Sequence, residues 1–353
     1  MNRLPLLLTF WIGLVLAGCG GAAPAASSSG AGGQASVSLP QAVAALVPDA
    51  KKEGTASIFG QTVDPQQVKA FEQAVSEFYG FAVKLEMVSG LHPTKAAEVV
   101  QTTKQGVPSG IDLFWTASNV AATLQSGGTL AALDWIKELG LDSSLKFGDH
   151  GLRTFDGTLA LVTYNTQQVS ANDAPKGYED LANPRWKGRI VMPRSGAFFS
   201  FVTHALGEDK VTALATDMVQ KQSVTIVPTY PDVRRRVASG EFVLGLGIDA
   251  IRDARRGAPV EMAPIDPFIV TPWGVHLMKD AKHPNMAKLV GYWMTTAAGQ
   301  KALDEINALS LASAQGTSMW KAAQGKKIDV IGPEFNQESD RLTKKYSELF
   351  GIQ

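Results

Sequence analysis

Apolar positions along the chain switch between a spacing typical of strands and one typical of helices. Residues 55–59 form a short β-prone run, and the Asp64-Pro65 pair after it predicts a helix start, with Asp64 as cap and Pro65 at the first helical position. Four apolar residues then recur at helical spacing: Val68, Phe71, Val75 and Phe78. Gly80 predicts the end of this helix.

The same alternation continues along most of the chain. Further strands are expected at 81–88, 111–115, 159–164, 189–192, 223–227 and 242–248, most of them followed by a helical pattern. Residues 269–278 predict two short strands around a turn at 271–274, and the chain is expected to be mostly helical after Pro284. Strands that alternate with helices are typical of an α/β fold with parallel strands and right-handed crossovers.

The N-terminus predicts the compartment. A positive start is followed by an apolar run at 4–17, which is short for a bilayer span but suits a signal peptide over 1–18. Leu16-Ala17-Gly18-Cys19 resembles the bacterial lipobox, and Cys19 is the only cysteine, so it cannot form an intramolecular disulfide. We therefore expect lipidation at Cys19 and anchoring to the outer face of the cytoplasmic membrane. An ordinary secretory signal or a membrane-spanning anchor are the alternatives.

Composition narrows the function further. Residues 19–38 are mostly Gly, Ala and Ser and predict a flexible tether. Lys and Arg together number 33, as do Asp and Glu, so no broad electrostatic field is expected to hold nucleic acid. The chain has no Gly-x-Ser-x-Gly, His-Glu-x-x-His or Walker-type run. We therefore expect neither catalytic residues nor a cofactor, and not an enzyme.

Several short segments, taken in order, resemble one known family. The most specific is the run Asp-Leu-Ala-Asn-Pro-Arg-Trp-Lys-Gly-Arg-Ile at 180–190; the others stand at 70–72, 80–83, 164–166, 239–241, 257–260, 283–284 and 298–300. Together they resemble the type 2 periplasmic solute-binding proteins of ABC importers, in the subgroup that includes ferric-iron, thiamine, polyamine and phosphonate binders. The resemblance covers about residues 51–303.

This resemblance implies two α/β lobes with a ligand cleft between them. The first lobe would comprise 39–164 and 273–310, and the second 165–272, with crossings near Tyr164-Asn165 and Pro272-Trp273. The helices expected at 311–353 could join either lobe. The implied partners are a small solute and the permease of an ABC importer, with the protein acting as a monomer whose lobes close on the ligand.

The strand pattern points to the same cleft. Ligands of open α/β sheets bind outside the carboxyl ends of the strands, where this sequence has short polar turns that lead into helices. Helix N-termini there would favour an anion or another hydrogen-bond acceptor, so we expect a small polar, anionic solute. The candidate ligand-binding residues are Gln61, Ser89, Gly90, Ser118, Asn119, Tyr164, Arg194, Ser195, Gly196, Tyr230, Asp249 and Trp273.

Each candidate also has a purely structural interpretation. Ser118 is expected first as a helix cap, Asp249 could equally be one, and core packing is the default for Trp273. His92 stands at a helix start and is expected at the surface or beside the cap, with contact to the ligand as the alternative.

Other ligands remain open. Ferric-iron members of the family use two adjacent tyrosines in the stretch that here is 247–251, and this chain has no adjacent tyrosines, so no metal site is expected. Ferric iron bound as a complex with its own anion is an alternative. Thiamine or a polyamine would instead depend on Asp249 and the aromatic residues. A ligand-sensing subunit is a further alternative to transport.

Overall fold

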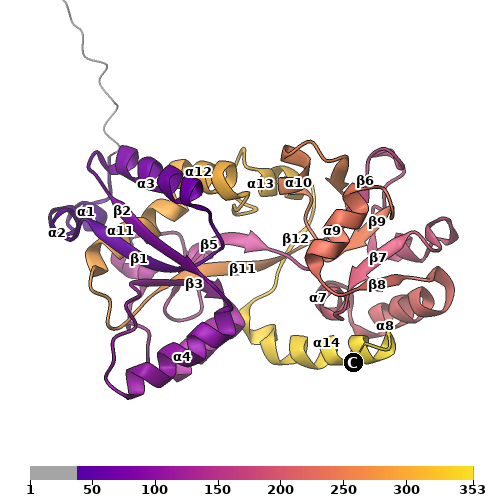
Figure 1. Cartoon of the computed structure of the whole chain (residues 1–353), viewed down its shortest axis with the longest axis horizontal. Helices are drawn as coiled ribbons and strands as arrows, with labels where there is room; N and C mark the ends of the chain where they lie inside the picture. Colours follow the sequence, from indigo (N-terminus) through magenta and orange to yellow (C-terminus); the bar gives the residue numbers. More distant parts are fainter. Residues whose placement is uncertain (1–37, 353) are drawn as a thin grey trace, which may run out of the picture. The chain divides into compact units, whose positions relative to one another are not determined.

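The computed structural model describes residues 38–352, which form two β-sheets with helices packed on them (Figure 1). This confirms the expected α/β class. The predicted signal peptide, Cys19 and the tether up to residue 37 lie outside the described residues. No described helix is both long enough and apolar enough to cross a membrane.

The first sheet has seven strands in the order β2-β1-β3-β11-β5-β4, with β12 beside β11. Their bounds are β1 Thr55–Gly60, β2 Lys84–Ser89, β3 Leu113–Ala117, β4 Lys146–Phe147, β5 Gly151–Gly157, β11 Phe268–Leu277 and β12 Ile328–Val330. The strands β2, β1 and β3 are parallel, as the alternation predicted, whereas β11 runs antiparallel to both β3 and β5.

Helices cover both faces of the first sheet because alternate strand residues point to opposite sides. In β3, Leu113 and Trp115 join one core while Phe114 joins the other. The helices on this sheet include α2 Val47–Glu53, α3 Pro65–Tyr79, α4 His92–Lys104, α5 Ser118–Ser126, α11 Pro284–Thr295 and α12 Ala297–Asn307. Figure 1 shows α3 and α12 above this sheet and α4 below it.

Helix α3 forms where its sequence predicts. The Asp64 carboxylate accepts hydrogen bonds from the backbone N–H groups of Gln66 and Gln67, and the Gln67 side chain accepts one from the Asp64 N–H. Gly80 ends the helix in the left-handed conformation that glycine adopts without strain.

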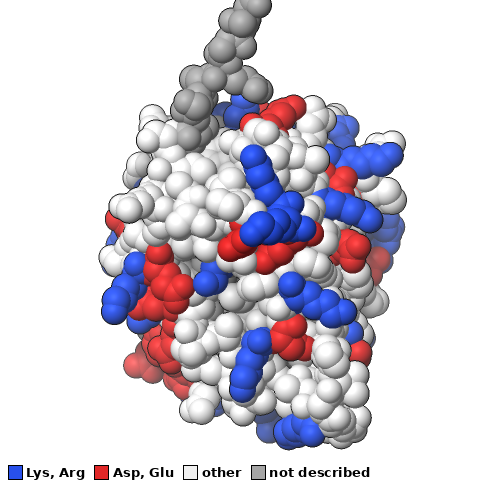
Figure 2. Space-filling view, turned by 90° about the vertical axis from the view of Figure 1, so that its left-hand side faces the viewer, with Lys and Arg blue, Asp and Glu red and all other residues white. Residues whose placement is uncertain are grey.

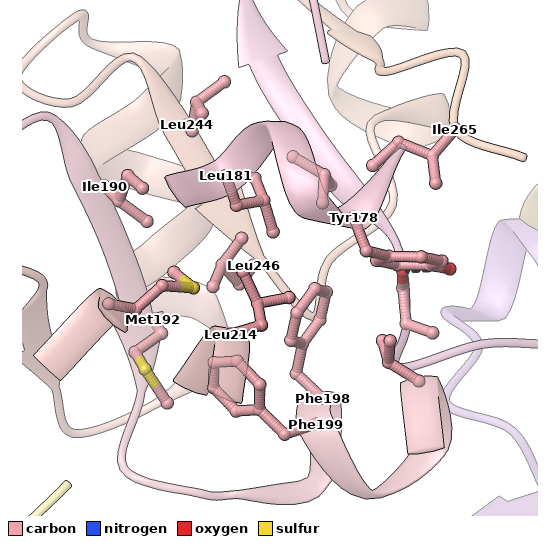
Figure 3. Close-up of a cluster of buried hydrophobic side chains, with 14 of the residues drawn as sticks. Tyr178, Leu181, Ile190, Met192, Phe198, Phe199, Leu214, Leu244, Leu246 and Ile265 are labelled. Atoms are coloured by element: carbon pink, nitrogen blue, oxygen red, sulfur yellow. Dashed lines mark hydrogen bonds between the residues drawn. The ribbon is translucent and has the colours of Figure 1, made fainter. Parts of the chain in front are cut away.

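The second sheet has five strands in the order β10-β6-β9-β7-β8. These are β6 Val162–Asn165, β7 Ile190–Pro193, β8 Thr225–Val227, β9 Leu244–Leu246 and β10 Val260–Met262, packed with α7 Ala197–Leu206, α8 Glu208–Asp217, α9 Tyr230–Ala238 and α10 Ile251–Arg255. Figure 3 shows part of the core of this sheet, to which Met192 of β7, Leu244 of β9, and Phe198 and Phe199 of α7 all belong.

Three segments pass from one sheet to the other. Residues 158–161 connect β5 to β6, and residues 263–267 lead from β10 into β11. The third segment is 331–335, which leads from β12 to α14 Asn336–Leu349; α13 Ser318–Ala323 precedes β12. Helix α14 packs on α7, and its Leu342 and Tyr346 are fully buried in the core of the second sheet.

The expected turn at 271–274 is wrong. β11 is one continuous strand through Pro272, which pairs with Asp156 of β5, and the register shifts just after it, between Trp273 and Gly274. Proline lacks an N–H group for a regular ladder, and an irregularity of this kind accommodates it without ending the strand. The sequence reasoning also missed the short strand β12 within the C-terminal helical region.

Candidate functional site

A cleft of about 580 Å³ lies where strand ends of the first sheet face α10, α13 and α14. Six of the predicted ligand-binding residues line it: Gln61, Gly90, Ser118, Asn119, Asp249 and Trp273. The other six do not: Ser89, Tyr164, Arg194, Ser195, Gly196 and Tyr230. All but one of the six lining residues belong to the first sheet and its helices, whereas Asp249 follows β9 of the second.

Helix α14 packs against the turn that follows β7 in the second sheet. The Gly196 N–H donates to Ser347 Oγ of α14 at 3.0 Å. A Cβ on Gly196 would lie 2.5 Å from the Thr343 carbonyl oxygen, so the α14 backbone packs directly against this turn. Tyr230 is hydrogen-bonded to Ser195, and its burial raises the pKa of its hydroxyl.

Tyr164 lies within the second sheet rather than at the cleft. It pairs with Leu244 of β9 and Glu261 of β10, and its hydroxyl donates to the Glu261 carboxylate at 2.6 Å. Arg194 is exposed, and its backbone N–H donates to the Val227 carbonyl. Neither side chain is among the groups that surround the cleft.

Three helices begin at the cleft without a side-chain cap: α4, α5 and α14. The expected role of Ser118 as cap is wrong, because Ala117 holds the cap position. Ser118 Oγ instead donates to Asn336 Oδ1 at 2.9 Å, which joins the start of α5 to the start of α14. In α5 the Val120 N–H is bonded to Asn119 Oδ1 at 3.0 Å, so the other first-turn N–H groups and the partial positive charge of these helix starts are what favour an anion.

One wall of the cleft is aromatic. The Trp273 indole stacks on Phe155, with ring centroids 5.4 Å apart and an interplanar angle of 23°. The His92 ring meets Trp273 edge-on at 5.6 Å. All three residues line the cleft, so Trp273 is a wall residue and is only partly buried, contrary to the core-packing default.

His92 is held in a defined orientation. Its Nδ1 lies 2.9 Å from Thr116 Oγ1, and its ring packs on Phe59 as well as on Trp273. Burial lowers the pKa of the His92 imidazole from its ordinary value, and a hydrogen bond with the Gly60 backbone opposes this shift only in part. The ring is therefore neutral at pH 7 and adds no positive charge to the cleft.

Gln61 reaches the cleft because of the glycine before it. A Cβ on Gly60 would lie 2.7 Å from Trp115 Cβ, so only glycine allows β1 to pass this buried indole. The Gln61 Nε2 atom is buried and has no hydrogen-bond partner among the described residues. A buried amide donor without a partner is costly, and an acceptor on a ligand would satisfy it.

The charged groups of the cleft are not equivalent. The Asp249 carboxylate is 2.6 Å from Arg234 Nη2, and the buried Asp156 carboxylate is 2.6 Å from Arg153 Nη2. The Arg252 guanidinium of α10 also lines the cleft but forms no ion pair or hydrogen bond with the described residues, although the Asp249 and Asp253 carboxylates are near enough to raise its pKa. Burial nevertheless lowers the pKa of this guanidinium, which still remains charged at neutral pH.

Sequence reasoning missed Arg252 and Asn336 as residues of the cleft. Arg252 stands three residues after Asp249, in the helix that follows a predicted strand, so its position gave a usable signal. Asn336 gave none, because nothing in the local sequence indicates that α14 returns to the cleft.

The described residues contain no group of three or more His, Cys, Asp or Glu side chains placed to hold a metal ion. The chain has six tyrosines, and none of them lines the cleft. A bare ferric ion prefers anionic oxygen ligands. Two of the three carboxylates that line this cleft, those of Asp156 and Asp249, are already in ion pairs with arginines.

The surface carries charges of both signs. Figure 2 shows Lys and Arg interspersed with Asp and Glu on the face that lies to the left in Figure 1. This agrees with the balanced composition of the whole chain.

Comparisons with known proteins agree with this fold. Residues 66–325 match the family model of bacterial extracellular solute-binding proteins. A "Fe(3+)-binding periplasmic protein" of Serratia marcescens is 27% identical over 235 residues, which cover 62% of this chain and 68% of that protein.

Two solved structures illustrate the structural likeness. The substrate-binding protein of an ABC transporter from Agrobacterium tumefaciens has a TM-score of 0.66 and 15% identity, covering 84% of this chain and 94% of that one. The periplasmic binding protein AfuA from Actinobacillus pleuropneumoniae, with fructose-6-phosphate bound, has a TM-score of 0.58 and 17% identity, covering 85% and 100%.

These matches confirm the predicted family and its two-lobed fold. Family members are substrate-binding proteins of transport systems rather than enzymes, and they deliver small solutes to ABC importers. The chain belongs to the family of bacterial extracellular solute-binding proteins and acts outside the cytoplasm as the solute-capturing component of an ABC importer.

Proposed function

We propose that the cleft captures a small polar, anionic solute and that the protein hands it to the permease of the importer. The observation that carries this proposal is Arg252, a guanidinium that lines the cleft without a carboxylate partner among the described residues. The uncapped starts of α4, α5 and α14 support the same sign of charge.

Neutral groups would add selectivity. Gln61 offers an unpartnered amide donor, and Ser118 and Asn119 lie at the start of α5. Closure of the lobes on a bound anion would remove water from these groups and strengthen each interaction. Asp249 lies in the same cleft, but its carboxylate already binds Arg234, which reduces its attraction for a cation.

The anionic ligand is tested by a thermal-shift screen of the purified protein against phosphate, phosphonates, carboxylates, thiamine, spermidine and ferric citrate. A ligand that binds only the folded state raises the melting temperature in a concentration-dependent way. We expect an anion to do so, and we expect Arg252→Gln to weaken its binding by about tenfold or more.

Arg235→Gln is the matched control, because Arg235 is exposed and pairs only with Asp232 of its own helix. It should leave the affinity unchanged. A melting shift produced by thiamine or spermidine alone, and insensitive to Arg252→Gln, would refute the anionic ligand.

Ferric iron is a second candidate, because the relative from Serratia marcescens is named for it. With no tyrosine in the cleft, iron would arrive here as a complex with its own anion, and Arg252 would then contact that anion. Binding of ferric citrate, but of neither citrate alone nor the other anions, would favour this candidate.

We also propose that the protein is a monomer held on the outer face of the cytoplasmic membrane by a lipid on Cys19. The Leu16-Ala17-Gly18-Cys19 motif supports the anchor. Cys19→Ser should release the protein from the membrane fraction, and its retention there would refute lipid anchoring. Loss of solute uptake on deletion of the protein would separate transport from a purely sensing role.

A further inference from the structure

The cleft is large for an inorganic anion. Its volume of about 580 Å³ falls in the range of pockets that bind whole organic molecules, roughly 300–1,000 Å³. An apolar cavity of about 150 Å³ is already sufficient for benzene. A phosphate or a similar ion would therefore occupy only a small part of the cleft as it stands in this structure.

Much of the wall is apolar. Large apolar side chains from several elements line the cleft, among them Leu159, Leu161, Phe201, Leu309, Ile331 and Phe335. Leu91, at the start of α4, also lines it and is 77% exposed. Leu161, Leu309 and Ile331 are already buried, but Leu91, Leu159, Phe201 and Phe335 are exposed or half-buried. An apolar group on the solute would remove these four surfaces from water, whereas an entirely hydrophilic solute would not.

Trp273 provides a flat surface within this wall. Phe155 stacks on the indole and the His92 ring meets it at 82°, yet Trp273 is only half-buried, so part of the indole stays open to the cleft. The indole N–H makes no hydrogen bond with the described residues and is not among their buried polar atoms without a partner. It is therefore accessible to a ligand. Aromatic rings prefer offset or edge-on partners in such positions.

The orientation of this indole is fixed by its surroundings. Trp273 pairs with Ala117 of β3 on one side and Phe155 of β5 on the other, and the His92 edge abuts its ring. A Cβ on Gly157 would lie 3.0 Å from the indole Nε1, so the glycine leaves the room that the ring occupies. A surface that is ordered before binding costs little entropy when a ligand stacks on it.

From these observations we infer that the solute is an organic anion with a flat, apolar body that stacks on Trp273. The anionic part rests on the proposed function, and the flat body rests on the aromatic wall and the cleft volume alone. The inference excludes inorganic anions and small open-chain anions as the preferred solute.

The test measures binding of matched compounds by titration calorimetry on the purified full chain. Methylphosphonate is compared with phenylphosphonate, and acetate with phenylacetate, so that the anionic group is constant within each pair. We expect the phenyl member to bind about tenfold more tightly or better, because the ring is buried against the indole. Thiamine serves as an aromatic cation.

Two variants locate the gain. Trp273→Leu keeps an apolar side chain but removes the flat surface, and it should reduce the phenyl preference to less than about threefold, whereas Trp273→Phe should retain most of it. Trp320→Ala is the control, because Trp320 of α13 does not line the cleft, and it should change nothing.

The outcomes separate this inference from the proposed function. Equal binding of both members of each pair, unaffected by Trp273→Leu, would overturn the flat body and leave the anionic site standing. Binding of thiamine alone, weakened by Trp273→Leu, would overturn the anionic site and retain the flat body. The highest concentration tested is 10 mM, about ten times a weak Kd of 1 mM. If none of the five compounds binds at that concentration, both the anionic site and the flat body are overturned.

Discussion

The two sheets present their strand-end turns in different ways. Turns of the first sheet, at Gln61, Gly90 and Ser118-Asn119, open into the cleft. The corresponding turn of the second sheet at 194–196 is packed under α14, whose backbone lies against Gly196. The turns at Ser89-Gly90 and Ser195-Gly196 have similar sequences. They differ because the second has its backbone N–H bonded by the protein itself, whereas the first opens into the cleft.

The difference shows that a polar strand-end turn marks a possible site only where no other element covers it. Helix α14 covers the turn after β7, yet its own N-terminus lines the cleft with Asn336 and Ser339. On the side of the second sheet, the polar contribution thus comes from Asp249 in the turn after β9, from α10 and from a helix at the far end of the chain. The predictions below test this division, from the largest expected effect to the smallest.

Phe199→Ala should have the largest effect. Phe199 is fully buried (Figure 3). It stacks on Phe350 at 5.0 Å and lies 5.7 Å from Tyr346. Truncation should lower the free energy of unfolding by about 3–5 kcal/mol and loosen α14. Urea denaturation measures the loss, and hydrogen exchange measures the protection of α14.

Phe71→Ala is the matched control in the core of the first sheet, where Phe71 is 2% exposed and packs edge-on against Trp293. It should destabilise by a similar amount without a selective loss of protection in α14. Equal protection of α14 in both variants would contradict the idea that this helix depends on the second core.

Gly196→Ala should destabilise the protein by about 2–3 kcal/mol, because the new Cβ would overlap the backbone of α14 at Thr343 and Ser347. Gly90→Ala is its counterpart in the first sheet, where the Cβ would meet only Phe59 at an ordinary 3.6 Å. It should leave stability within about 0.5 kcal/mol. Thermal or urea unfolding compares the two, and equal losses would show that the turns are not covered differently.

Acid should weaken the first sheet through His276 of β11. This ring is 3% exposed, and burial lowers the pKa of its imidazole to about 4, against about 6.5 in the unfolded chain. Both states are neutral at pH 7.5, whereas at pH 5 the unfolded state binds a proton that the folded state does not. Stability should therefore fall by about 2 kcal/mol between these pH values.

Urea denaturation of His276→Met at the same two pH values isolates this contribution. Met can fill the site and does not titrate, so the variant should lose about 2 kcal/mol less than the parent on acidification. An identical pH dependence in parent and variant would show that His276 is not the group responsible.

The smallest effect is expected at the hydrogen bond that joins the starts of α5 and α14. In a double-mutant cycle of Ser118→Ala and Asn336→Ala, the coupling energy from urea denaturation should be about 0.5–1.5 kcal/mol. Ser126→Ala is the control, because its hydroxyl binds only the Thr123 carbonyl of the same helix. A coupling energy of zero would show that this hydrogen bond does not join the two helices in solution.

Local rules predicted the elements whose causes are local. Helix α3 begins at its Asp64 cap and ends at Gly80, and the strand–helix alternation of the first half was right for β1 and β3, which bury both faces. Pro272 misled the local rule for turns, since the irregularity beside it in β11 depends on pairing with β5.

The cleft residues were likewise predicted only where their position depends on the local order of strands and helices. The turns of the first sheet precede helices in sequence, so their place at the sheet edge follows from the order of strands and helices. The covering of Gly196 and the role of Ser118 required α14, which is 140 residues or more away along the chain. No local spacing carries information about such a contact.

The sequence by itself determined the family, the α/β class and the edge of the first sheet at which the cleft lies. Only the tertiary structure decided which turns stay open, that the arginine lining the cleft makes no ion pair, and that Trp273 stacks on Phe155 in the cleft wall. The physical reason is that backbone periodicity and capping act over a few residues, whereas burial and charge pairing depend on groups brought together from distant parts of the chain.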